Sequence, residues 1–244
     1  MTEQSKHENL SALKQRLACV AALVWILVAI VMVQQAVAGA EKPFNTEDLS
    51  GWSFKHHDSN ESQWRVGTAK LHPDDPRALL VTDGDELVNA NGHGVDIYSD
   101  EVYGDHVIEL EVMVPRGSNS GIYVHGEYEV QVLDSYGQEN PGVGDMGGIY
   151  GAAPPTNPRY VAPGEWNTFR IAFRAPRFNS DGEKTHDAVF EEVKLNGRVI
   201  HEDLTIGGPT PAGVDGREKA EGPIMFQGDH GPVSYRNIRI TPLD

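Results

Sequence analysis

The sequence predicts an all-β fold, a single β-sandwich that spans residues 41–244. Segments that alternate apolar and polar residues recur after residue 40, and Gly, Pro, Asn and Asp bound them. No stretch of this region keeps a helical hydrophobic period for three turns. The region also contains no cysteine, which excludes disulfides, thiolate metal sites and a cysteine nucleophile.

The composition excludes several classes of protein. The 244 residues are 39% hydrophobic and 23% charged, as in an ordinary globular protein, so collagen, coiled coil and wholesale disorder are excluded. Twenty Lys and Arg face 36 Asp and Glu, for a net charge of -16. Because this charge repels phosphate backbones and the basic residues are not clustered, we expect no nucleic-acid partner.

Residues 1–40 form a separate segment. Three basic side chains precede an unbroken apolar run at residues 17–33, and small residues follow at 36–40. This order is typical of a secretory signal, with a hydrophobic helix and cleavage after Ala38 or Ala40. The length of the run also allows a retained signal-anchor. Either outcome predicts export to the periplasm, cell envelope or extracellular space, with membrane contact only through an uncleaved segment.

Five segments after residue 40 are the clearest strands. In the first, Ile108 and Leu110 fall on one face while Glu109 and Glu111 fall on the other, the two-residue period of a half-buried strand. The five strands are expected at residues 107–114, 128–133, 168–173, 189–195 and 235–240.

The connections between strands carry their own signals. Asn196-Gly197 lies between two apolar segments and predicts a two-residue hairpin, because both turn positions need positive φ. Two long loops, at residues 138–163 and 207–222, are rich in Gly and Pro. Loops of this length in a compact sandwich are commonly functional, and the first could cover a cleft.

The densest polar chemistry lies on one expected strand. By strand parity Glu127, Glu129 and Gln131 share a face at intervals of about 6.6 Å. A solvated sheet face is the simpler interpretation, because charged side chains mostly lie in water. Neighbouring residues of types that bond sugar hydroxyls favour a carbohydrate site instead; they are Asn119, Ser120 and Tyr136.

Glu127 and Glu129 do not fit a conventional two-carboxylate glycosidase. An acid and a base should flank the scissile bond from different sides, whereas these two share one strand. Gln131 lies four residues after Glu127, where some sandwich glucanases carry a second carboxylate, and an amide cannot cycle a proton. His125 with Glu127 or Glu129 could instead hold a divalent cation through nitrogen and oxygen ligands.

A second polar cluster, Gln227-Gly228-Asp229-His230, lies near the C-terminus. Residues 224–226 and 233–240 are expected to be paired strands, with Asp229 and His230 in their turn. A turn Asp commonly bonds the backbone, which would leave the His incidental. The functional interpretation is an imidazole oriented by a carboxylate, a general base near neutral pH. Arg236 is either a structural strand residue or a clamp for an anionic intermediate.

Taken in order, these segments resemble the 3-keto-disaccharide hydrolase family, from about residue 44 to residue 242. The matching segments include Asp48-Leu49-Ser50-Gly51-Trp52, Ser118-Asn119-Ser120-Gly121-Ile122, Tyr128-Glu129-Val130-Gln131-Val132, Gly164-Glu165-Trp166-Asn167-Thr168 and Asp229-His230-Gly231-Pro232-Val233. The resemblance implies a concanavalin A-like jelly-roll sandwich and an exported bacterial enzyme that acts on glycosides oxidised at C3. Two positions depart from the family pattern: relatives commonly have Arg in place of His125, and many lack Gly228.

The resemblance also implies cleavage by elimination. A ketone at C3 acidifies the C2 proton, so its removal allows the glycosidic bond at C1 to break, and water adds later. His230, oriented by Asp229, is then the expected base, and Glu129 is the acid or a metal ligand. Arg236 or a bound divalent cation would steady the enolate. The residues expected to contact substrate are Gln131, Asp134, Asn119, Tyr150, Gln227, Arg236 and Glu127.

Two other functions are compatible with the sequence. A non-catalytic carbohydrate-binding module would bind unoxidised glycans and release no product. A structural envelope protein would use the sandwich for association only, so changes in the polar cleft would leave its behaviour unaltered.

Overall fold

The computed structural model describes residues 39–55 and 62–243. The chain divides into two compact units, residues 1–40 and residues 41–244, and nearly all described residues belong to the second. The apolar run at residues 17–33 and its expected helix lie outside the described residues. Within the described ranges, no helix has the length and apolar character needed to cross a bilayer.

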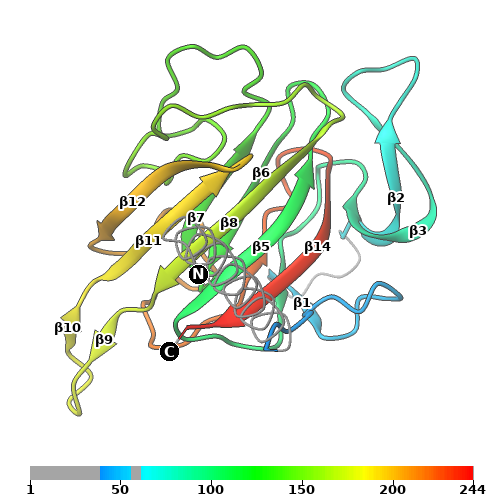
Figure 1. Cartoon of the computed structure of the whole chain (residues 1–244). Helices are drawn as coiled ribbons and strands as arrows, with labels where there is room; N and C mark the ends of the chain where they lie inside the picture. Colours follow the sequence, from blue (N-terminus) through cyan, green and yellow to red (C-terminus); the bar gives the residue numbers. More distant parts are fainter. Residues whose placement is uncertain (1–38, 56–61, 244) are drawn as a thin grey trace, which may run out of the picture. The chain divides into compact units, whose positions relative to one another are not determined.

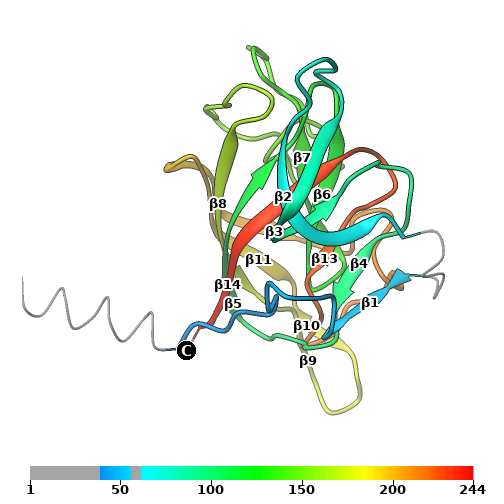
Figure 2. The same cartoon turned by 90° about the vertical axis from the view of Figure 1, so that its right-hand side faces the viewer.

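Two antiparallel sheets build residues 41–244, so the predicted all-β sandwich is confirmed. Figure 1 shows strands of the larger sheet running side by side, and Figure 2 turns the view toward the smaller sheet. In sheet order, the larger sheet contains β12 (Arg198–Ile206), β11 (Ala188–Leu195), β8 (Trp166–Arg174), β5 (His106–Met113), β14 (Val233–Pro242), β3 (Leu79–Asn89) and β2 (Trp64–Leu71). The smaller contains β1 (Trp52–Phe54), β4 (Ile97–Ser99), β13 (Met225–Phe226), β6 (Asn119–Val124) and β7 (Tyr128–Leu133). A separate two-stranded ribbon pairs β10 (Lys184–His186) with β9 (Arg177–Phe178).

The strands predicted from alternation are β5, β7, β8, β11 and β14, and all five are present within a few residues of the expected bounds. The predicted hairpin joins β11 to β12. Its two turn residues, Asn196 and Gly197, have φ of 51° and 76°. Both values lie in the left-handed region that this turn requires, which is why Asn-Gly is favoured there.

Aromatic rings join the two sheets. Phe226 of β13 stacks on Tyr235 of β14 with ring centroids 4.1 Å apart, and Trp52 stacks on the same Phe226 at 5.5 Å. Further along, Tyr128 of β7 packs 5.3 Å from Phe173 of β8. The structure corrects the prediction that residues 224–226 and 233–240 are paired strands. β13 and β14 are not a hairpin, because they lie in opposite sheets and face each other across the core.

Two buried histidines share one backbone acceptor in this core. His106 Nδ1 and His125 Nε2 lie 2.6 Å and 3.0 Å from the carbonyl oxygen of Gly104, and the two rings stack at 5.6 Å. Burial lowers the pKa of His106 from its ordinary 6.5 to about 4, and it also lowers the pKa of His125. Both imidazoles are therefore neutral near pH 7.

We expect the free energy of unfolding to fall as the pH drops from 6.5 toward 4. In this window the unfolded chain protonates His106, whereas the folded chain keeps it neutral, so protons favour unfolding. The shift in the His106 pKa alone corresponds to roughly 3 kcal/mol. Urea denaturation across this pH range measures the loss, and His106→Gln should show a shallower decline. An NMR titration of the His106 ring with a midpoint near 6.5 would contradict the expectation.

Candidate active site

Asn119, Tyr123, Glu129 and Gln131 of β6 and β7 share the face of the smaller sheet that points away from the core, whereas Ser120 faces the core and contacts Tyr235. Tyr123 lies opposite Glu129, and Gly121 lies opposite Gln131, so the predicted parity is confirmed. The apolar partners on β7 point into the core; they are Tyr128, Val130 and Val132. The solvated-face interpretation is wrong, because Glu127, Glu129 and Gln131 are only 3%, 3% and 4% exposed.

Glu129 is the most strongly perturbed acid of this face. Its pKa is raised from 4.5 to about 7, mainly by burial and also by the negative charges of Asp96 and Asp229. The neighbouring Tyr123 phenol and the charge of His230 lower the pKa of Glu129. Glu129 is therefore within electrostatic reach of the Asp229-His230 segment, although the two are about a hundred residues apart in sequence. Near neutral pH its carboxyl is poised to give or accept a proton.

Gly121 provides the space for the Glu129 carboxyl. A Cβ at this position would lie 2.4 Å from Glu129 Oε1 and 3.0 Å from Tyr123 Cε2. Both distances are shorter than van der Waals contact allows, so any side chain here would displace the carboxyl. The glycine beside Glu129 is thus part of the site.

We expect Gly121→Ala to displace the Glu129 carboxyl and leave the sheet intact. A displacement of about 1 Å can lower catalytic efficiency about a hundredfold. Gly207→Ala is the matched control, because nothing lies within 4 Å of its added Cβ. Kinetics of both variants on the same substrate test the prediction, and equal efficiencies would contradict it.

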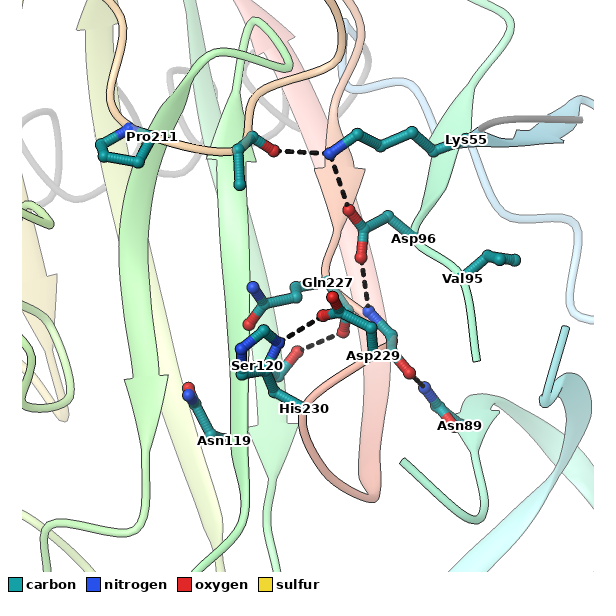
Figure 3. Close-up of polar contacts among 12 residues, drawn as sticks. Lys55, Asn89, Val95, Asp96, Asn119, Ser120, Pro211, Gln227, Asp229 and His230 are labelled. Carbon is teal, nitrogen blue, oxygen red and sulfur yellow. Dashed lines mark hydrogen bonds and ion pairs between the residues drawn. The ribbon is translucent and has the colours of Figure 1, made fainter. Parts of the chain in front are cut away.

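The Asp229-His230 segment lies in the crossing from β13 to β14. His230 Nδ1 is hydrogen-bonded to Asp229 Oδ1, as Figure 3 shows, and both side chains are half-exposed. The pairing that the sequence suggested is therefore present, in a crossover between sheets. With Asp229 on Nδ1, the Nε2 atom of the imidazole is left for a substrate.

Gly228 anchors this crossing. Its N–H donates to Asp96 Oδ1 at 2.9 Å, and its carbonyl accepts from Asn89 Nδ2 at 2.6 Å. A Cβ on Gly228 would lie 2.2 Å from the carbonyl oxygen of Val95, so only glycine fits. The residue that departs from the family pattern thus fixes the backbone directly before Asp229.

No sequence pattern predicted the partly buried ion pair beside this crossing. Lys55 Nζ lies 3.2 Å from Asp96 Oδ2 and donates to the carbonyl of Ala212 at 2.7 Å (Figure 3). The next carbonyl, that of Pro211, accepts from the Tyr123 phenol at 3.3 Å. Lys55 and Tyr123 are therefore neighbours along one loop. Nothing in the sequence around Lys55 marks it as part of a site.

Amide side chains complete the site. Gln227 is buried, and its Oε1 has no hydrogen-bond partner within the part of the chain that the structure describes. Gln131 Nε2 donates to Asn119 Oδ1 at 3.1 Å. Because a buried polar atom is costly without a partner, the carboxamide of Gln227 is suited to a ligand hydroxyl.

Three residues that the sequence predicted to contact the substrate have other contacts or lie elsewhere in the structure. Glu127 holds the loop at residues 207–222, because its carboxylate accepts the N–H groups of Asp215 and Gly216 at 2.9 Å and 3.0 Å. Tyr150 donates its backbone N–H to the Glu129 carbonyl at 3.1 Å, and its side chain is exposed. Asp134 lies at the end of β7 in a groove that also contains His230.

The structure does not bring His125 and Glu129 together as a metal-binding pair. His125 has a φ of 54° in the turn before β7, and its ring packs 5.0 Å from Phe173 in the core, whereas Glu129 lies on the other face. Among the residues that the structure describes, no three His, Cys, Asp or Glu side chains are grouped to hold a metal ion. The described residues therefore do not fit a divalent cation at His125 and Glu129.

Arg236 is not part of the site either. Its neighbour Tyr235 faces the core, so Arg236 points to the outer face of the larger sheet. There it is hydrogen-bonded to Glu111 and lies 3.9 Å above the ring of Trp166. The structural interpretation of this arginine is therefore the one that its contacts support.

Comparison with known proteins adds a family to this geometry. Residues 39–241 match the 3-keto-alpha-glucoside-1,2-lyase-like domain. A solved structure from Parabacteroides distasonis, described as a candidate glycosyl hydrolase, is 29% identical, with 84% of each chain covered and a TM-score of 0.63. A second structure from that organism with the same description is 17% identical, covers 86% of this chain and 97% of its own, and has a TM-score of 0.60. None of the curated proteins that were compared matches the sequence.

Proposed function

The chain belongs to the 3-keto-alpha-glucoside-1,2-lyase-like family, and on this premise we propose that it is a carbohydrate-active enzyme that cleaves 3-keto-glycosides such as 3-keto-disaccharides. The observation that carries the proposal is the buried Glu129, whose pKa of about 7 suits proton transfer, within reach of His230. The family also supports assigning the sandwich to the concanavalin A-like jelly-roll class.

In the proposed reaction, His230 and Glu129 divide the proton transfers. His230, held by Asp229, takes the C2 proton that the C3 ketone acidifies. The resulting enolate expels the C1 oxygen, and protonated Glu129 donates its proton to that leaving group. Water then adds across the C1–C2 double bond: its hydroxyl goes to C1, Glu129 accepts its proton, and His230 returns a proton to C2.

Lys55 replaces Arg236 in the proposed stabilisation of the enolate. Its ammonium lies partly buried beside Asp96, and two of its three N–H donors are used by Asp96 and Ala212. The third is left for an oxygen that gains negative charge. The amides of Gln131 and Gln227 are suited to holding the sugar hydroxyls.

A non-catalytic binding module is the alternative, and Glu129 argues against it. Sugar binding needs hydroxyl partners, which amides provide without a change of charge. A carboxyl buried so that its pKa approaches 7 is costly to stability, and such costs are typical of catalytic sites.

The test is incubation of the purified protein with a 3-keto-glucoside in D₂O, followed by proton NMR. The proposal expects release of the aglycone and a 3-keto-sugar that carries deuterium at C2, with no turnover of the unoxidised glucoside. Saturable binding of both glycosides without product would contradict the enzymatic function and favour the binding module.

We also propose that the protein is exported, on the order of basic, apolar and small residues at its N-terminus. Fractionation of cells with N-terminal sequencing tests this and distinguishes cleavage from retention. A chain recovered from the cytoplasm with residues 1–40 intact would contradict it.

A further inference from the structure

A groove of about 410 Å³ is lined by His230 and by residues of the loops that precede β3, β4 and β6. Besides His230, its charged and titratable lining residues are Arg77, His93, Arg116 and Asp134. Because His230 belongs to both, the groove is continuous with the proposed reaction site. It is the place where the sugar next to the reacting unit would lie.

The groove is basic, although the protein is acidic overall. Arg77 and Arg116 are exposed, and no ion pair or side-chain hydrogen bond occupies either guanidinium among the residues described. Asp134 pairs with neither guanidinium, because its two oxygens accept the backbone N–H groups of Gly117 at 2.9 Å and Tyr136 at 3.3 Å, and its single negative charge leaves the two arginines in excess. Two guanidinium groups are thus available in one concave surface.

Backbone contacts hold the walls of this groove in place. The N–H of Arg116 donates to the carbonyl of Pro76 at 2.8 Å, which joins the two loops that carry the arginines. Ser118 Oγ donates to the carbonyl of Pro232 at 2.6 Å, and a Cβ on Gly92 would lie 2.1 Å from the Gly231 carbonyl carbon. The backbone segments that carry the arginines are therefore held against the His230 turn, so binding has to order the arginine side chains but not the loops.

We infer that this groove is an anion-binding subsite, and that the substrate carries an oxyanion on the sugar next to the 3-keto unit. The anion is a uronic acid carboxylate or a sulfate ester, since a guanidinium binds both through paired N–H donors. The inference deepens the proposed function and rests on it for the position of the reacting sugar. The charge preference itself depends only on Arg77 and Arg116.

The test measures binding, so that it does not depend on turnover. Titration calorimetry compares three unoxidised disaccharides: a neutral one, one whose second sugar is a glucuronate, and one whose second sugar carries a sulfate. We expect an anionic disaccharide to bind about tenfold more tightly than the neutral one, and the arm that shows this identifies the anion. The preference should weaken as NaCl is raised.

Two variants test which residues cause the preference for an anionic disaccharide. Arg77→Gln/Arg116→Gln should remove the preference, whereas Arg198→Gln, an exposed arginine on the β11–β12 hairpin, should keep it. Equal affinities for all three disaccharides in the wild-type protein, or a preference that persists in the double variant, would overturn the inference. A charge preference that needs both arginines, in a protein that turns over no 3-keto-glycoside, would contradict the proposed function and support the subsite.

Discussion

Glu129→Gln is expected to abolish turnover and to stabilise the fold at the same time. Loss of a positioned general acid lowers kcat by about 10² to 10⁴. The folded state raises the pKa of Glu129 from 4.5 to about 7, so between these values the folded chain binds more protons than the unfolded chain. Stability therefore decreases as the pH rises through this window. The amide of Gln carries no charge, so at pH 8 the free energy of unfolding of Glu129→Gln should exceed that of wild type by about 1 to 3 kcal/mol.

The pH dependence distinguishes this effect from a general change in packing. Urea denaturation should show Glu129→Gln more stable than wild type at pH 8, with the difference shrinking toward pH 4.5. Glu109→Gln, an exposed glutamate on the larger sheet, is the control and should change neither stability nor turnover. A variant that loses stability at pH 8, or keeps its activity, would contradict the role assigned to Glu129.

His230→Ala is expected to abolish turnover without a loss of stability. The side chain is half-exposed and its hydrogen bond is to the adjacent Asp229, so few contacts are lost. Removing a general base lowers kcat by about 10² to 10⁴. Deuterium exchange at C2 of the 3-keto-glucoside should stop as well, because it depends on the same proton transfer.

His186→Ala provides the matched comparison for His230. His186 is an exposed histidine in β10, and its ring nitrogen Nδ1 lies 3.2 Å from Thr185 Oγ1. The His186→Ala variant should turn over substrate at the wild-type rate. C2 exchange that continues in His230→Ala would remove His230 from the mechanism.

Local patterns predicted the strands well because they depend on near neighbours. The alternation around Ile108 and Glu109 and the Asn196-Gly197 turn needed only a few residues to specify a face or a turn. The connection between β13 and β14 could not be predicted in this way. A hairpin within one sheet and a crossover between two sheets both require two apolar segments and a short turn, and the stacking of Phe226 on Tyr235 decides between them.

The site was only partly predictable for the same reason. Strand parity put Glu129 and Gln131 on one face, but their burial results from other parts of the chain. Thr210 shows this, because its hydroxyl accepts the N–H of Glu129 from a loop about eighty residues away. Lys55 also reaches the site from a distant part of the sequence, and no local motif marks it as a site residue. His125 was misplaced because its positive φ ends the parity on which the expected metal pair depended.

The central claim is that Glu129 and His230 act on one another in a single site. A carbon-13 NMR titration of the Glu129 carboxyl tests it directly, in the wild-type protein, His230→Ala and His186→Ala. The account predicts a midpoint of about 7 in wild type, a higher midpoint in His230→Ala because His230 lowers the pKa of Glu129, and no change in His186→Ala. A wild-type midpoint near 4.5, or one that does not respond to His230→Ala, would contradict it.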